Sequence, residues 1–231
     1  MEIIIITTSY LIAIIVSLIA KKRQTIEWVT ITASAVSLVC AVLIALKVVS
    51  FGSYSYSNFI LINPFAILVA LLVFLIGLMS ALYSKGYFEE ELSKNVVEIK
   101  KIRQYFIAFD LFILTMFFAV TVNNPIMMWI LIEATTLSTA FLISFYNKRS
   151  TMEAVWKYLI INSIGLLLGF FGTLLYMTSV KALNAEGLIS WNMLFENAKN
   201  LDPSLAKLAF IFVFIGYGTK VGFFPMHTWL P

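Results

Sequence analysis

Cysteine, histidine and charged residues are all scarce in this sequence. Its 231 residues include one cysteine and one histidine, which excludes an internal disulfide and a structural zinc site. Only 12% of the residues are charged, about half the share in an ordinary soluble domain. The net charge of +4 comes from residues that lie between apolar runs, so no nucleic-acid partner is expected.

Long apolar runs dominate the sequence instead. A helix needs about 20 mostly apolar residues to cross a hydrocarbon core of roughly 30 Å. Seven segments meet or approach this length: residues 3–20, 28–49, 64–83, 105–122, 125–146, 155–180 and 205–224. Six further runs follow the first, which is therefore a retained span and not a signal peptide. The sequence predicts an all-α, polytopic transmembrane helix bundle that forms a single domain over residues 1–231, with the lipid bilayer around it.

The distribution of lysine and arginine predicts how the chain is oriented in the membrane. Ten of these residues lie in the connections that follow the first, third and fifth runs. The N-terminus and residues 50–63 and 123–124 have none, while the connection after the sixth run has Lys181 and Lys199. Because positively charged connections face the cytoplasm, we expect a multi-pass protein of the cell membrane with its N-terminus outside. The charged segment 85–104 is then a solvated cytoplasmic helix and loop.

Four ionisable residues lie inside the apolar runs, namely Asp110, Glu133, Lys157 and Lys220. Such a residue costs at least roughly 2.5 to 3.5 kcal/mol, so it is usually paired, buried in protein and functional. Asp110 and Lys157 lie near the ends of their runs. Either side chain extends to the interface or serves a function, and if the fourth and sixth runs touch, the two side chains form a pair.

Glu133 lies near the middle of the membrane, about 12 Å along its helix from Pro125. Small and hydroxyl residues follow it, with Thr136 one turn away, and such residues let a neighbouring helix approach closely. The functional interpretation is a proton carrier or an electrostatic switch. The alternative is a buried carboxylate that locks two helices together through a hydrogen bond.

Lys220 lies in a segment that disfavours a continuous helix. The residues that weaken this helix are Gly216, Gly218, Gly222 and Pro225. We therefore expect the seventh span to be broken near Pro225, as in the discontinuous transporter helices that surround an aqueous cavity. Glu133 and Lys220 are then a coupled pair, with a static salt bridge as the alternative.

Two further features follow from spacing and residue type. His227 lies beyond the expected break, and the unperturbed pKa of histidine, near 6.5, suits a proton relay, although such a residue is as often structural. Gly165 and Gly169, continued by Gly172, have the spacing of close packing between helices, and we interpret them in that way and not as a dimerisation motif.

Three motifs occur in order, each on the expected span: residues 128–138, 156–163 and 218–231. Together they resemble the proton-conducting antiporter-like membrane subunits of respiratory complex I, the Mrp antiporters and the membrane-bound hydrogenases. The run Glu133-Ala134-Thr135-Thr136-Leu137-Ser138, combined with Gly218-Thr219-Lys220-Val221-Gly222, is most similar to hydrogenase-4 component F.

The resemblance implies a role for each matching residue. Glu133 modulates the proton affinity of Lys220, whose deprotonation passes a proton along a hydrated axis. Lys157 connects the input path to that pair, and His227 matches the histidine after the helix break. The implied function is proton or cation translocation, coupled to redox chemistry in the other membrane and peripheral subunits of a hydrogenase or NADH-dehydrogenase-like complex.

The chain itself offers no catalytic centre and no metal site, and because one cysteine cannot ligate an iron–sulfur cluster, no cofactor is expected. The resemblance covers the N-terminal half of such subunits, so a chain that supplies the missing helices is an expected partner. Two alternatives remain: a subunit of a Mrp-type sodium/proton antiporter, and a structural or assembly subunit that conducts nothing.

Overall fold

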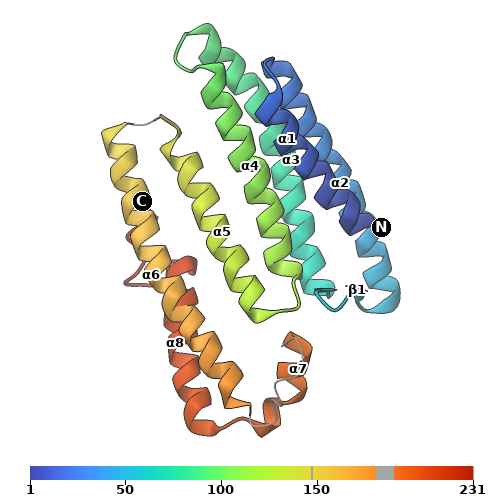
Figure 1. The fold of residues 1–231 in the computed structure, drawn as a ribbon, viewed down its shortest axis with the longest axis vertical. Coiled ribbons are helices and arrows are strands. Elements are labelled where there is room, and N and C mark those ends of the chain that lie inside the picture. The colour runs from blue at the N-terminus through green and yellow to red at the C-terminus, as the bar shows by residue number, and fades with distance from the viewer. Residues whose placement is uncertain (147, 181–189, 231) are drawn as a thin grey trace. The chain divides into compact units, whose positions relative to one another are not determined.

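The computed structural model describes residues 1–146, 148–180 and 190–230, and these residues are almost entirely helical (Figure 1). Seven helices in this part of the chain are long and apolar enough to cross a membrane, which confirms the all-α polytopic fold. Two residues named above lie outside the described residues: Lys181, in the connection after the sixth run, and Pro231, at the end of the third motif. The chain divides into two compact units, Met1–Thr121 and Val122–Pro231, called unit 1 and unit 2 below. The single domain expected from the sequence stays a prediction.

Unit 1 contains four long helices and one short hairpin. The helices are α1 (Glu2–Ile19), α2 (Arg23–Phe51), α3 (Pro64–Ser93) and α4 (Ile99–Thr121). Between α2 and α3, strand β1 (Tyr54–Tyr56) pairs antiparallel with β2 (Ile60–Ile62), and this hairpin was not expected from the sequence. Aromatic side chains fill the core, where Phe74 lies 6.2 Å from Tyr10 and 5.2 Å from Phe117 between ring centroids.

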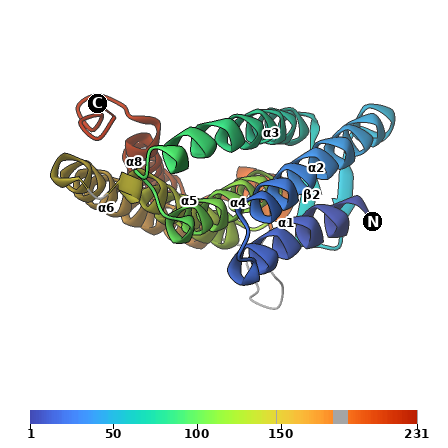
Figure 2. The ribbon, with the colours of Figure 1, turned by 90° about the horizontal axis from the view of Figure 1, so that it is seen from above.

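The described residues of unit 2 form three long helices and one short one. They are α5 (Pro125–Ile143), α6 (Arg149–Ser179), α7 (Trp191–Glu196) and α8 (Pro203–Val221). Short 3₁₀ turns occur at Ser144–Tyr146 and Ala198–Asn200. Helices α6 and α8 run side by side, and Figure 2 shows the same pair from above.

Three of the long helices begin with the same two-residue signal, an Asn or Asp followed by Pro. In α3, α5 and α8 the side chain of the first residue accepts a hydrogen bond from the amide of Ala66, Met127 or Leu205, at 2.8, 2.9 and 3.2 Å. Proline then occupies the first helical position, where its missing N–H has no intrahelical partner to lose. These starts lie close to those expected, at residues 64, 125 and 205.

Helix α8 ends at Val221, three residues before Phe224, where the sequence analysis ended that span. Gly222 adopts φ +81° and ψ 37°, a left-handed conformation that glycine adopts without a steric penalty. The amides of Gly222 and Phe223 donate to the carbonyls of Thr219 and Gly218, at 3.1 and 3.0 Å. The helix therefore ends at its glycine cap, and Pro225 lies in the turn that follows.

Three helices of unit 1, α2, α3 and α4, are longer than the apolar runs that predicted them. Helix α2 begins at Arg23, and α3 continues to Ser93, so that only residues 94–98 separate α3 from α4. The expected charged segment 85–104 is thus mostly helix. Hydropathy marks where a helix meets hydrocarbon and not where it ends, because charged residues are good helix formers in water.

Glycines let the backbones of α6 and α8 approach each other closely. A Cβ added to Gly216 would lie 2.1 Å from the backbone nitrogen of Gly169, and one added to Gly165 would lie 1.8 Å from Thr219 Oγ1. A Cβ on Gly172 would lie 2.6 Å from the backbone nitrogen of Val213. These contacts confirm that the glycine spacing on α6 serves helix packing.

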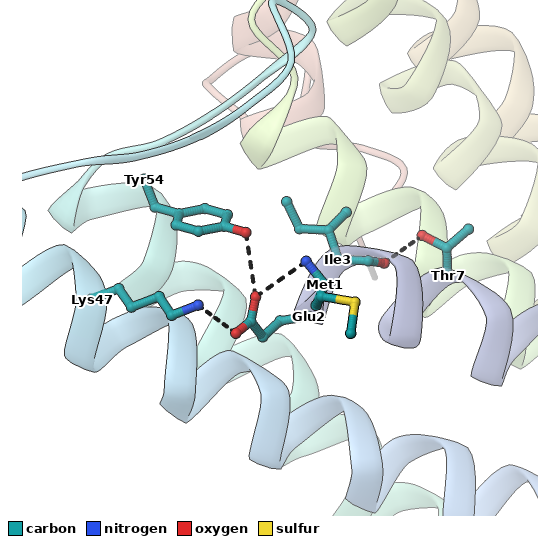
Figure 3. Close-up of polar contacts among 6 residues, drawn as sticks. All are labelled: Met1, Glu2, Ile3, Thr7, Lys47 and Tyr54. Carbon is teal, nitrogen blue, oxygen red and sulfur yellow. Dashed lines mark hydrogen bonds and ion pairs between the residues drawn. The ribbon is translucent and has the colours of Figure 1, made fainter.

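Charged and polar side chains mark the two ends of unit 1. At one end Glu2 accepts hydrogen bonds from Lys47 at 2.5 Å and from Tyr54 at 3.3 Å (Figure 3). Burial, and then the nearby Glu2 carboxylate, raise the pKa of Tyr54. At the other end Arg103 on α4 donates to the carbonyl of Ala20 at 2.8 Å, so this basic part of α4 lies beside the connection after α1.

We predict that Gly216→Ala destabilises the protein by roughly 1 to 3 kcal/mol, the usual range for overpacking. The added methyl would meet the backbone of α6, which has no side chain to move aside. Thermal unfolding of the detergent-purified protein measures the effect. Gly86→Ala on α3 is the matched control, because nothing lies within 4 Å of its Cβ position, and it should be neutral or stabilising. Equal stability of Gly216→Ala and the parent would contradict the packing argument.

Candidate functional site

Lys220 lies in the last turn of α8 and points towards α5 and α6. Its Nζ donates hydrogen bonds to Thr136 Oγ1 on α5 at 2.7 Å and to Tyr158 OH on α6 at 3.0 Å. The same nitrogen lies 5.2 Å from the centroid of the Tyr158 ring. Both oxygens are neutral, so a half-buried ammonium group is held by hydroxyls, an aromatic face and the negative end of its own helix dipole.

A second hydroxyl of α5 belongs to the same cluster, because Thr139 Oγ1, one turn beyond Thr136, lies 2.6 Å from Tyr158 OH. Lys220, Thr136, Tyr158 and Thr139 are called the Lys220 group below. Sequence reasoning did not select Tyr158 or Thr139. Tyr158 directly follows Lys157 in the second motif, and adjacent helical residues point about 100° apart. The tyrosine is therefore buried at 6% exposure, whereas the lysine faces outward.

Glu133 makes its own contact, one turn before Thr136 on α5. Its Oε1 accepts a hydrogen bond from Ser163 on α6 at 2.8 Å, and its Oε2 is buried without a hydrogen-bond partner in the described part of the chain. Among the described residues no ion pair within 4.0 Å joins Glu133 to Lys220. The expected pair is thus not in direct contact, and the static salt bridge is not formed. The bond to Ser163 does join two helices, as the alternative interpretation of Glu133 requires.

The structure does not bring Lys157 to this group. Lys157 pairs with Glu153 at 2.7 Å, and the two side chains are 59% and 67% exposed. Asp110, expected either to extend to the interface or to serve a function, is fully buried in unit 1 and accepts a hydrogen bond from Thr30 at 3.0 Å. The two residues that sequence reasoning treated alike therefore differ completely in their surroundings.

The segment after α8 folds back over the end of the helix. Trp229 Nε1 donates to the carbonyl of Thr219 at 3.0 Å, and its ring meets Tyr158 edge to face at a centroid distance of 5.3 Å. The His227 ring stacks on Phe224 at 5.6 Å. Within the described residues its Nδ1 is buried without a hydrogen-bond partner. Trp229 is therefore the residue of this segment that contacts Tyr158, and the relay role of His227 stays a prediction.

The chemistry available here is proton transfer. Hydroxyl groups both accept and donate, so Tyr158 and Thr139 are able to pass a proton towards or away from the amine. No carboxylate among the described residues lies close enough to fix the ammonium form. Glu133 lies on α5 one helical turn before Thr136, the residue whose hydroxyl accepts the hydrogen bond from the amine.

The sequence and the fold are both similar to those of known proteins. Residues 122–231, which are unit 2, match the family described as "NADH:quinone oxidoreductase/Mrp antiporter, TM". The chain is 39% identical over 176 residues to the hydrogenase-4 component F homolog of Methylacidiphilum infernorum, covering 75% of this chain and 37% of the relative. It is 25% identical over 182 residues to NADH-quinone oxidoreductase subunit N of Campylobacter concisus, covering 78% and 34%.

Two solved structures have a similar fold. A chain of the membrane-bound sulfane sulfur reductase, an archaeal respiratory membrane complex, superposes with a TM-score of 0.78 at 18% identity, covering 99% of this chain and 45% of its own. A chain of respiratory complex I from Thermus thermophilus gives 0.74 at 16% identity, covering 99% and 46%. The present chain thus spans about a third of the curated relatives above and just under half of the solved chains.

We predict that Trp229→Phe loosens the segment that covers the Lys220 group. The variant keeps a ring against Tyr158 but loses the bond to Thr219, worth about 1 kcal/mol, so amides 223–230 should exchange about fivefold faster. Hydrogen–deuterium exchange with mass spectrometry measures this. Trp156→Phe is the matched control, because Trp156 is 60% exposed on α6. Unchanged exchange in Trp229→Phe would show that the indole bond does not hold the segment.

Proposed function

We propose that the chain moves protons across a membrane, on the basis of the match of residues 122–231 to the NADH:quinone oxidoreductase/Mrp antiporter transmembrane family. In this proposal it is a subunit of a hydrogenase or NADH-dehydrogenase-like complex, and partner subunits supply the redox chemistry. A further chain segment supplies the rest of the pathway. The membrane is the cell membrane, with the N-terminus outside.

One observation carries the proposal, namely the environment of Lys220. Its amine is held by the hydroxyls of Thr136 and Tyr158 and has no carboxylate within 4.0 Å among the described residues. A permanently paired ammonium would be a structural cation. An amine with neutral partners loses and regains its proton without breaking an ion pair, as a relay requires.

In the proposed mechanism, a change in the charge of Glu133, which lies one helical turn before Thr136 on α5, alters the proton affinity of Lys220. When Glu133 is neutral, the amine releases its proton to the hydroxyl system of Tyr158 and Thr139. When Glu133 is ionised, the amine takes up a proton again. Lys157 and His227 stay predictions as further relay positions, and Lys157 would act from the exposed face of α6.

A second candidate function is a subunit of a sodium/proton antiporter, which the description of the matching family includes. The two candidates differ in what drives transport. A respiratory subunit transports protons only while electrons flow through its partners, whereas an antiporter exchanges sodium for protons without a redox partner. The same vesicles therefore distinguish them when sodium and the electron donor are varied separately.

We predict that Lys220→Met lowers proton transport by about two orders of magnitude, the lower end of what a positioned proton-transfer group contributes. Inverted vesicles from the native membrane, with a pH-sensitive dye, measure transport alongside electron transfer. Lys207→Met on the same helix is the matched control, since Lys207 is exposed. Glu133→Gln should also impair transport, and Glu153→Gln, on the exposed face of α6, should not. Normal coupled pumping by an assembled Lys220→Met complex would overturn the proposal and favour a structural subunit.

A further inference from the structure

Asp110 is the ionisable residue that the proposed relay does not use. It lies on α4, seven residues after Arg103, whose guanidinium bonds to the carbonyl of Ala20 at the end of α1. At 1.5 Å per residue, Asp110 is therefore roughly 10 Å inside unit 1 from that end. Its side chain has no exposed surface.

The contacts of Asp110 do not compensate a negative charge. Thr30 donates the one hydrogen bond to Oδ2, at 3.0 Å, and Oδ1 has no partner among the described residues. No described cation lies within 4.0 Å of it, and the nearby titratable group on α1 is Tyr10. Burying an unpaired carboxylate costs several kcal/mol, whereas a neutral carboxylic acid needs far less compensation.

The face of α2 that contacts Asp110 is polar over half of its length. Four buried residues at helical spacing form this face, Glu27, Thr30, Ser34 and Ser37. Helix α1 adds hydroxyls to it, because Tyr10 OH donates to Ser34 Oγ at 3.3 Å and Ser9 Oγ lies 3.2 Å from Ser37 Oγ. Beyond Ser37 the buried face of α2 is apolar, with Ala41, Ile44 and Val48.

Glu27 joins this polar face to the charged end of unit 1. Its side chain is buried, and neither carboxylate oxygen accepts a hydrogen bond in the described residues. The Nε of Arg23 lies 3.3 Å from Glu27 Oε1, and the Nη2 of Arg23 lies 3.8 Å from the exposed carboxylate of Glu89. Polar groups therefore continue from solvent at Glu89 to Glu27, which lies one turn from Thr30. The buried face of the second half of α2 carries aliphatic side chains and offers no such route.

We propose that Asp110 is a proton-binding site of unit 1, which holds a proton at neutral pH and exchanges it with water through the end that carries Arg23 and Glu27. The ligand is a proton and not a metal ion, because hard cations require several oxygen ligands and, among the described residues, Thr30 alone contacts the carboxyl group. The site is separate from Lys220, which belongs to unit 2. Because the polar face reaches only one end, the site equilibrates with one side of the membrane.

Infrared difference spectroscopy of the full native polypeptide, purified from its own membrane, tests the proposal. A protonated carboxylic acid gives a carbonyl band that a carboxylate lacks. We expect this band at neutral and mildly alkaline pH in the parent, its loss in Asp110→Asn and its retention in Glu133→Gln, the relay variant. In D₂O the band should shift, and Glu27→Gln should slow that shift at least about tenfold, since it removes a proton-transfer group.

A matched pair of variants tests the site even where Asp110→Asn does not accumulate. Thr30→Val removes the hydroxyl that bonds Asp110 and should move the band, whereas Thr32→Val removes an exposed hydroxyl that bonds the carbonyl of Val29 and should leave it unchanged. Identical spectra of the parent and Asp110→Asn, or no effect of Thr30→Val, would overturn the proton site. An unchanged rate in Glu27→Gln would overturn the route. Proton pumping by Lys220→Met decides the other proposal and leaves this one untouched.

Discussion

The backbone contact between α6 and α8 is the constraint on which unit 2 depends. Gly216 packs on the backbone of Gly169 and leaves no room there for a side chain of its own, and this approach sets the position of every later residue of α8. Thr219 fits against Gly165, and Lys220, the next residue, then reaches Thr136 and Tyr158. In a membrane, where lipid tails are as apolar as leucine side chains, such close packing is a main source of helix association.

The end of α8 gains its stability from groups that the helix itself cannot supply. Gly222 turns the chain, and Trp229 returns to bond the carbonyl of Thr219. Carbonyls in the last turn of a helix lack intrahelical donors, and water does not satisfy them inside a bilayer. The same indole ring packs on Tyr158, so one residue both gives the Thr219 carbonyl a second donor, beside the Gly222 amide, and covers the lysine site.

The sequence predicts the fold well and the site in part. Apolar runs, Asx-Pro starts and glycine spacing indicate seven helices, several boundaries and the packing face, because each depends on local chemistry. The resemblance to antiporter-like subunits is confirmed by the family match and the relatives. Tyr158 was not expected from the sequence. It is buried beside the exposed Lys157, and the order of residues alone does not say which of two neighbours points inward. Sequence reasoning also named Glu133 and Lys220 a coupled pair without fixing their contacts, since spacing along two helices does not determine which side chains meet; the amine contacts Thr136 and Tyr158.

Helix α3 is long enough to extend from the hydrocarbon core of a membrane into water. Its 30 residues extend about 45 Å, some 15 Å more than the hydrocarbon core. The ion pair of Glu90 and Lys94 lies at its far end, with both side chains more than half exposed. Dissolved ions weaken the attraction within an exposed ion pair but act little on buried groups. Salt concentration is therefore a selective variable for this molecule: it weakens the charged tip of α3 and leaves the hydroxyl contacts of Lys220 and Asp110 almost unaffected.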